Sequence, residues 1–473
     1  MNRRVIISIG AVLAIGACSD QQDPSPTTEG ALAVSKASKP YVLTFTSSRA
    51  RDIENVVAKA GGSIAHVFKA GGIATAQSAD PDFAERLGST AGITAVAEDT
   101  IVQWVDPNER FTLAENAIGD TERWFPIQWN LRAVKAQDAW ALEKGSGARV
   151  AILDGGIWNQ HVDLAPNLDE AASRSFVTGV TNPFTDLGTF WHGTHVAGIV
   201  AAADNRTNLG TIGIAPEATI IGVKVLHGGT GAFGGVIMAI RYAATARSAG
   251  GAGADIINMS LGAQLPSAQD SKVRALKALL DEATNFAQAQ GVLVIASTGN
   301  GDRQGRGIDH DQGQWFSLPA QADHVVGVSA LGPVGFARGA TNFDRLASYS
   351  NFGLRIVDLS GPGGDFVLPG EDLCTLAINP ATGATTTTVT QPCWVFDMVV
   401  SSCRGTGTSN VCWAAGTSMS APAVSAVAAL MVAKQDRRIT FNELAAATDD
   451  LGEPGTDAIY GQGRVNALKA VSP

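Results

Sequence analysis

Positive charge is scarce in this sequence of 473 residues, in which 34 Lys and Arg face 44 Asp and Glu for a formal net charge of −10. Charged residues make up only 16% of the chain. A protein that binds nucleic acid through its phosphates needs clustered Lys and Arg. No basic stripe of that kind is present, so we expect no nucleic-acid partner.

Long apolar runs are also missing near the N-terminus, where the run Val5–Ala17 is too short to cross a bilayer. The run follows two arginines, as the hydrophobic part of a secretory signal does. Gly16 and Ala17 precede Cys18, and small residues before a Cys are typical of a bacterial lipoprotein signal. We predict a lipoprotein-type signal peptide over 1–17 and an exported protein that a lipid on Cys18 holds at the outer membrane or cell surface. An ordinary secretory signal with an incidental Cys is the alternative.

Cysteine is also scarce, with five residues in the whole chain. Apart from Cys18, the four others (Cys374, Cys393, Cys403 and Cys412) lie in one stretch. An even number of clustered cysteines in an exported protein predicts disulfides. The first choice is Cys374–Cys393 with Cys403–Cys412, although the sequence alone does not decide the pairing. A zinc site of four thiolates is the alternative, but the tight C-x₂-C spacing is absent.

The character of the chain changes twice before residue 129. Residues 18–39 are rich in Gln, Asp, Pro, Ser and Thr and predict a flexible tether. Strand and helix patterns then alternate over 40–105, with one strand expected from Ile93 to Val105, and predict a small α+β domain. Residues 106–128 are turn-rich and predict a linker.

From Trp129 onward, short apolar runs alternate with segments of helical length. The runs that read as buried strands are 150–153, 220–226, 256–260, 292–296 and 325–329. Continuous apolar strands between helices predict an α/β fold, with a doubly wound, mainly parallel sheet and helices on both faces. Functional groups in such sheets gather at the carboxyl ends of strands, and Asp154 and Asn300 stand just past two such ends.

Ser418 lies in the segment GTSMSAP (416–422), directly before an apolar run of helical length. Pro422 is best tolerated in the first turn of a helix, so we expect Ser418 at a helix N-terminus. Free N–H groups and the helix dipole favour negative charge at that position. A lone Ser before a helix is most often a cap, and Asp154, His192 and Asn300 taken singly read as turn or helix-start residues.

Four motifs in the order Asp, His, Asn, Ser change that reading. They are VAILDGGI (150–157), WHGTHVAG (191–198), ASTGN (296–300) and GTSMSAP (416–422). In this order they resemble those of the subtilisin-like serine proteases. The segments SLG (260–262), DRLASYSNFG (344–353) and YGQGRVNA (460–467) extend the resemblance from about residue 129 to the C-terminus.

The resemblance implies a subtilisin-like fold and hydrolysis of peptide bonds in protein or peptide substrates, with no cofactor required for the chemistry. It implies that Ser418 is the nucleophile, His192 the general base and then acid, and Asp154 the residue that orients the imidazole. The Asn300 side-chain amide and the Ser418 backbone N–H would hold the oxyanion. The segment Ser260-Leu261-Gly262 would pair with the substrate as an added strand.

Residues 40–105 resemble the inhibitory propeptide of these proteases, an intramolecular partner whose C-terminal tail lies in the active site after autocleavage. VAED (96–99) followed by Thr100–Val105 looks like that tail. Residues 106–128 would then be a linker and processing region. A monomeric protease domain would span 129–473, with a Cys-bearing insertion near 364–413. Cleavage would release the enzyme from the lipid on Cys18, whereas an accessory domain is the alternative for 40–105.

Two departures from the family pattern matter. The family usually has Ser or Thr after the catalytic Asp, but this chain has Gly155, so we expect reduced support for Asp154. Asp204–Gly210 occupies the loop where many relatives bind calcium, which makes a structural calcium ion possible there. The length of this loop and Arg206 in its middle argue against that carry-over.

Two rival hypotheses remain at this stage. A zinc hydrolase would use His192, His195 and Asp154 as ligands, although the H-E-x-x-H pattern is absent. We expect His195 instead to pack in the core with a satisfied hydrogen bond. A non-catalytic surface binding protein on a protease scaffold is the other rival, with Gly155 as the sign of lost activity.

Overall fold

The computed structural model of the chain describes backbone and side chains over most of its length, and of residues 110–113 and 266 the backbone alone. The described residues are 38–105, 110–113, 124–187, 190–204, 210–266, 271–313, 315–379, 388–405, 408 and 410–473. The predicted signal peptide, Cys18 as the predicted site of a lipid, and nearly all of the predicted tether lie outside these residues. So does the greater part of the loop at which a calcium ion was considered possible, residues 205–209.

A nine-stranded sheet forms the centre of the fold, in the order β21-β22-β16-β15-β13-β11-β7-β9-β8. Every pairing in it is parallel except that between β21 and β22. The strands are β7 (Arg149–Asp154), β8 (Arg174–Ser175), β9 (Thr219–Lys224), β11 (Ile256–Met259), β13 (Leu293–Ser297), β15 (Val325–Leu331), β16 (Leu359–Pro362), β21 (Thr448–Asp449) and β22 (Arg464–Val465).

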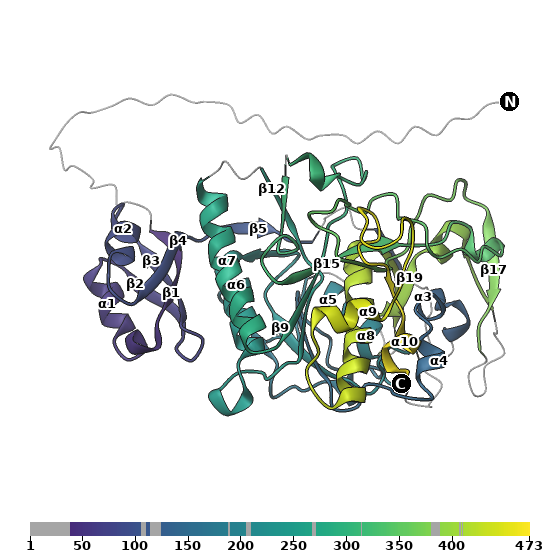
Figure 1. The fold of residues 1–473 in the computed structure, drawn as a ribbon, viewed down its shortest axis with the longest axis horizontal. Coiled ribbons are helices and arrows are strands. Elements are labelled where there is room, and N and C mark those ends of the chain that lie inside the picture. The colour runs from purple at the N-terminus through teal and green to yellow at the C-terminus, as the bar shows by residue number, and fades with distance from the viewer. Residues whose placement is uncertain are drawn as a thin grey trace, which may run out of the picture. The chain divides into compact units, whose positions relative to one another are not determined.

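Helices cover both faces of this sheet (Figure 1). On β7, Val150 and Ile152 join one hydrophobic cluster with α5 and α8, whereas Ala151 and Leu153 join another with α6 and α7. Alternate side chains of one strand thus enter two cores, which is why the strand reads as a continuous apolar run. The predicted doubly wound α/β fold is confirmed. The helices are α3 (Trp129–Ala133), α4 (Ala136–Ala139), α5 (His192–Ala201), α6 (Phe233–Ala244), α7 (Ser271–Ala289), α8 (Thr417–Gln435), α9 (Phe441–Ala446) and α10 (Ala467–Val471).

The helix α8 is apolar and long enough to cross a membrane by composition alone, but 89% of its apolar window is buried inside the protein. A helix that is apolar all round fits the centre of a large core. We therefore describe α8 as the central core helix.

A separate four-stranded antiparallel sheet precedes this body, in the order β2-β3-β1-β4. Its elements are β1 (Lys39–Phe45), α1 (Ile53–Lys59), β2 (Ser63–Phe68), β3 (Ile73–Ser78), α2 (Phe83–Gly88) and β4 (Ile93–Glu98). We call residues 39–98 the N-terminal module. Glu282 of α7 accepts hydrogen bonds from Thr44 and Thr94 of the module and from Arg241 of α6. The module thus rests on α6 and α7.

The single strand expected from Ile93 to Val105 is wrong, because the chain turns at Asp99. The Asp99 carboxylate accepts from Thr100 N and Gly234 N, at 2.9 Å each. These bonds hold the turn against the first residues of α6, where a carboxylate is favoured. The next strand, β5 (Ile101–Gln103), leaves the module and pairs with β10 (Thr230–Ala232) of the main body.

The Cys-bearing insertion forms short antiparallel pairs held by the two disulfides that the sequence analysis put first, Cys374–Cys393 and Cys403–Cys412. The alternative of a four-thiolate zinc site is therefore wrong. The remaining strands are β12 (Ala263–Pro266), β14 (Trp315–Leu318), β17 (Leu373–Ala377), β18 (Thr388–Pro392), β19 (Val399–Ser402), β20 (Val411–Ala415) and β6 (Arg110–Leu113). β6 pairs with β20, the strand that leads into α8.

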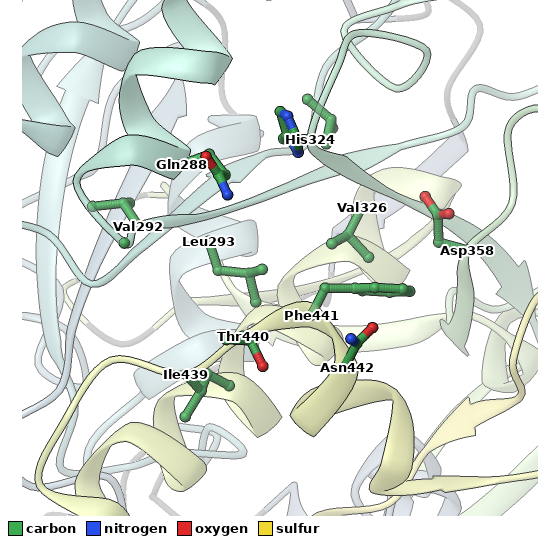
Figure 2. A pocket seen from close by; sticks show the side chains of 12 residues that line it. Gln288, Val292, Leu293, His324, Val326, Asp358, Ile439, Thr440, Phe441 and Asn442 are labelled. Carbon is green, nitrogen blue, oxygen red and sulfur yellow. The ribbon is translucent and has the colours of Figure 1, made fainter.

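A cavity of about 440 Å³ opens at the amino-terminal ends of β13 and β15, away from the strand ends that carry Asp154 and Asn300. Figure 2 shows Gln288, Phe441 and Asp358 among its lining residues. Asp358 accepts a hydrogen bond from Gly327 N, but burial raises the pKa of its carboxyl to about 6.

This raised pKa gives a pH prediction. Because the folded-state pKa of Asp358 lies above the unfolded value, its ionisation opposes folding at neutral pH, and stability rises as pH falls from 7 towards 5. Replacing Asp358 with Asn should raise the free energy of unfolding at pH 7 by up to about 3 kcal/mol and flatten that rise. Urea unfolding at pH 7 and pH 5 measures the change in the free energy of unfolding. Asp323→Asn, at an exposed position, is the control. An unchanged pH profile would contradict the prediction.

Candidate active site

Asp154 and His192 form a buried hydrogen-bonded pair. Asp154 is the last residue of β7 and His192 the first of α5, and they are 1% and 6% exposed. His192 Nδ1 lies 2.9 Å from Asp154 Oδ1 and 2.8 Å from Oδ2. A carboxylate only accepts, so Nδ1 carries the hydrogen and the lone pair of the neutral imidazole is on Nε2. The pair can therefore accept a proton at Nε2 and stabilise the resulting charge.

Ser418 is the second residue of α8, as expected for a residue at a helix N-terminus. The expected place of Pro422 is wrong, because it lies in the second turn, where the missing N–H would have bonded the carbonyl of Ser418. The hydroxyl of Ser260 donates to that carbonyl instead, at 2.8 Å. Ser260 thus satisfies the acceptor that Pro422 leaves open and fixes the first turn of α8, which carries Ser418.

The side chain of Asn300 has a defined orientation. Its Oδ1 accepts from Thr417 N at 2.8 Å and from Thr417 Oγ1 at 2.7 Å. The Nδ2 donors are therefore turned away from Thr417. Asn300 and Ser418 line the same cavity of about 580 Å³, so the amide is available to a negatively charged oxygen near Ser418.

Of the predicted substrate edge Ser260-Leu261-Gly262, two residues are buried and one pairs with an extended segment. Ser260 and Leu261 are buried, at 0% and 1% exposure, and so face the interior. Gly262 N donates to Trp104 O at 2.7 Å, so this residue does pair with an extended segment. Two features of the site were not predicted from the sequence: Thr417, which orients Asn300, and the opposite edge formed by β10. For Thr417, its place beside Ser418 in GTSMSAP was the available signal.

Residues Ile101–Val105 lie between the two edges. β5 pairs with β10, and Trp104 N and Val105 N donate to Gly229 O at 3.0 and 3.3 Å. The ring of Trp104 is buried against Phe233, and its Nε1 donates to Gly231 O at 2.9 Å. Gln103 and Val105 line both the cavity with Asp154 and His192 and the cavity with Asn300 and Ser418. The four candidate residues thus adjoin one bound strand.

His195 is fully buried, and its Nε2–H donates to Cys412 O at 3.1 Å. Burial lowers the pKa of His195 to about 3, so the ring is neutral. This is the packing role expected for it. Across the described parts of the chain, no three His, Cys, Asp or Glu side chains are grouped as a metal site would require. Nothing in this geometry favours the zinc-hydrolase rival.

The loop closed by Cys403–Cys412 contacts the segments that carry Asp154 and His192. Asn410 O accepts from His161 Nε2 at 2.8 Å, in the loop after Asp154. The guanidinium of Arg404 lies 4.3 Å from the ring centre of Trp158 and 5.7 Å from that of Trp191, the residue before His192. The disulfide loop therefore braces both segments.

Comparison with known proteins gives consistent results. Residues 145–463 match the Peptidase_S8 model, described as the subtilase family. The chain is 28% identical to thermitase from Thermoactinomyces vulgaris over 347 residues, which cover 73% of this chain and 95% of thermitase. It is 27% identical to the thermophilic serine proteinase of Bacillus sp. (strain AK1) over 391 residues, 81% of this chain and 76% of that protein.

Solved structures show the same fold. The epidermin leader peptide processing serine protease from Staphylococcus aureus superposes with a TM-score of 0.67 at 20% identity, covering 92% of this chain and 98% of that one. A lanthipeptide protease superposes with a TM-score of 0.55 at 23% identity, covering 75% and 98%. At these identities the likeness concerns the fold alone.

Proposed function

The chain belongs to the subtilase family of serine endopeptidases. From that premise we propose that it is an exported enzyme whose Ser418 is acylated by the substrate, and that its own N-terminal module inhibits it until autocleavage. Catalysis in this family needs no cofactor. The observation that carries the proposal is the segment Ile101–Val105, which is bound between two edges beside the Asp154–His192 pair.

The proposed chemistry is acyl transfer. Ser418 Oγ attacks the scissile carbonyl while His192 Nε2 takes its proton, and Asp154 stabilises the imidazolium that forms. Asn300 Nδ2 and Ser418 N donate to the oxyanion. His192 then protonates the leaving amine, and a water that His192 deprotonates releases the acyl group from Ser418.

The proposed inhibition is occupation of the substrate groove. The N-terminal module rests on α6 and α7 through Glu282, and Asp99 turns the chain into the groove at the start of α6. Trp104 then anchors the strand with a buried ring and three hydrogen bonds to Gly229, Gly231 and Gly262. An extended peptide held in this way has the backbone pairing of a substrate.

The position of autocleavage follows from the pairings on either side of the site. Val105 lines the cavity with Ser418, and Arg110–Leu113 pairs with β20, the strand that leads to Ser418. We therefore expect cleavage of one bond between Val105 and Arg110, with β6 retained by the protease. We also propose that the precursor carries a lipid on Cys18, and the disulfides suit an exported, oxidising location.

Intact-mass measurement of precursor and product tests these proposals together. The precursor should carry the mass of a lipid at Cys18, and the mature form should begin between residues 106 and 110. Trp104→Ala should weaken inhibition about 100-fold, because a large buried ring is lost at the anchor. Ile101→Ala is the matched control, since that neighbouring side chain is 72% exposed. Equal inhibition in both variants, or a mature N-terminus elsewhere, would refute the proposed inhibition.

A further inference from the structure

Gly155 is the residue at which this chain departs from its family, and the structure shows what fills the missing volume. A Cβ built on Gly155 would lie 2.3 Å from Asp186 Oδ2 and 3.0 Å from Asp186 Cγ. The backbone φ of Gly155 is not in the left-handed region, so other residues could adopt it. Glycine is therefore required here by space, because the carboxyl of Asp186 occupies the position of a side chain.

Asp186 is not free to move away from that position. Its side chain is only 6% exposed. Its Oδ1 accepts from Leu187 N at 2.9 Å and from Gly228 N at 3.1 Å. Displacing the carboxyl would break both bonds, which hold it against two exposed backbone donors.

The counter-ion of Asp186 is Lys224, the last residue of β9, whose side chain is completely buried. Lys224 Nζ lies 3.8 Å from Asp186 Oδ1 and donates to the carbonyls of Gly155 and Leu226. A buried ammonium is costly unless it is paired and hydrogen-bonded, so the lysine depends on Asp186. Through Lys224, the carboxyl at Asp186 is linked to the peptide that follows Asp154.

The backbone of Asp154 is held from the same side. Its carbonyl accepts from Val225 N at 2.9 Å and from Leu226 N at 3.2 Å. The last residue of β9 and the two that follow it therefore hold both Asp154 and Gly155 through hydrogen bonds. Lys224 provides the bond to Gly155. A shift of Lys224 would move the carboxylate that bonds His192 Nδ1, and small displacements in a catalytic pair are expensive.

We propose that Asp186 is a positioning residue for the catalytic pair, which takes the place of the side chain missing at Gly155 and, with Lys224, holds the Asp154–Gly155 peptide in register with His192. This inference rests on the proposed roles of Asp154 and His192. It explains the glycine at position 155 by the space that Asp186 occupies, without assuming that the protein has lost its catalytic activity. The titratable groups around Asp186 are Lys224 and His227, 3.8 and 3.9 Å from its Oδ1, and Asp154, which bonds His192. Burial raises the pKa of the Asp186 carboxyl, and the charge of Lys224 opposes that rise.

A double-mutant cycle tests the proposal. Gly155→Ser introduces the residue type usual in the family, yet it should lower kcat about tenfold or more with little change in KM, because the new side chain displaces Asp186. Asp186→Ala alone should also lower kcat about tenfold, because Lys224 loses its counter-ion. Adding Asp186→Ala to Gly155→Ser should cost nothing further, because the carboxyl is already displaced. Losses that multiply, or full activity in Gly155→Ser, would overturn the proposal.

The isosteric Asp186→Asn substitution tests the charge of Asp186 through the pH profile of kcat/KM. A purely structural role for Asp186 would leave that profile unchanged. Removing a negative charge near His192 makes its protonated form less favourable, so the acidic limb of kcat/KM should shift to lower pH by about half a unit. Rates are expressed per site labelled by an active-site phosphonate, and thermal unfolding checks each fold. A parent enzyme that does not label would defeat the proposed function. A labelled, active parent with an unshifted profile in Asp186→Asn defeats this inference alone.

Discussion

Replacing Ser418 with alanine is expected to abolish peptide hydrolysis, with kcat falling roughly 10⁶-fold, and to leave the chain uncut between Val105 and Arg110. Ser418 carries the attacking oxygen in the proposed mechanism, and neither His192 nor Asn300 can replace it as a nucleophile. Hydrolysis of a short peptide measures the first effect. The intact mass of the purified chain measures the second, because a precursor that cannot acylate itself keeps its N-terminal module.

Ser420→Ala is the matched control for this substitution. Ser420 is buried in the same helix two residues further on, and its hydroxyl donates to the carbonyl of Thr417 within that helix. Its loss should leave activity close to that of the parent. If Ser418→Ala still processed itself, the assignment of the nucleophile would be wrong. Absence of phosphonate labelling in the parent would favour the non-catalytic binding protein.

Asp154→Asn should lower kcat about 10⁴-fold at neutral pH with a small change in KM. The carboxylate accepts the Nδ1–H of His192 through both oxygens and so leaves the basic lone pair on Nε2. An amide can donate to Nδ1 instead, which places the hydrogen on Nε2 and removes the base. It also removes the charge that stabilises the imidazolium.

Initial rates across a pH series measure this loss, with Asp358→Asn as the control. Asp358 is a partly buried aspartate next to a strand of the main sheet, but it lines the cavity of Figure 2, at the opposite strand ends from Asp154. Its substitution should change stability and leave kcat unaltered. A residual activity of Asp154→Asn within tenfold of the parent would remove Asp154 from the proposed mechanism.

Most of the fold could be predicted from periodicity. The buried strands of the main sheet are runs such as 150–153 and 292–296, in which both faces enter a core and every residue is apolar. Asp154 and Asn300 could be located because polar residues directly after such runs stand at the carboxyl ends of strands. The break after Glu98 could not, because the turn there depends on Asp99 meeting the N-terminal end of α6, far along the chain.

The supporting contacts of the site were not predictable for a related reason. Ser260 looked like part of a substrate edge, but its hydroxyl satisfies a carbonyl that Pro422 leaves without a donor. Asp186 lies in a loop with no periodicity, and its contact with Gly155 depends on tertiary packing. Gly155 therefore appeared as a loss in the sequence, whereas in the folded chain it makes room for a carboxyl group.

If the proposed inhibition holds, the segment Ile101–Val105 also determines when the enzyme can work. While this segment is joined to the body of the protein, its local concentration in the groove is fixed by the chain and does not depend on dilution. After the bond beyond Val105 is cut, occupancy depends on the affinity of the module and on its bulk concentration. Under the proposed inhibition, activation would depend on how far the two pieces diffuse apart, so the same cut molecule would be inhibited when crowded and active when dispersed.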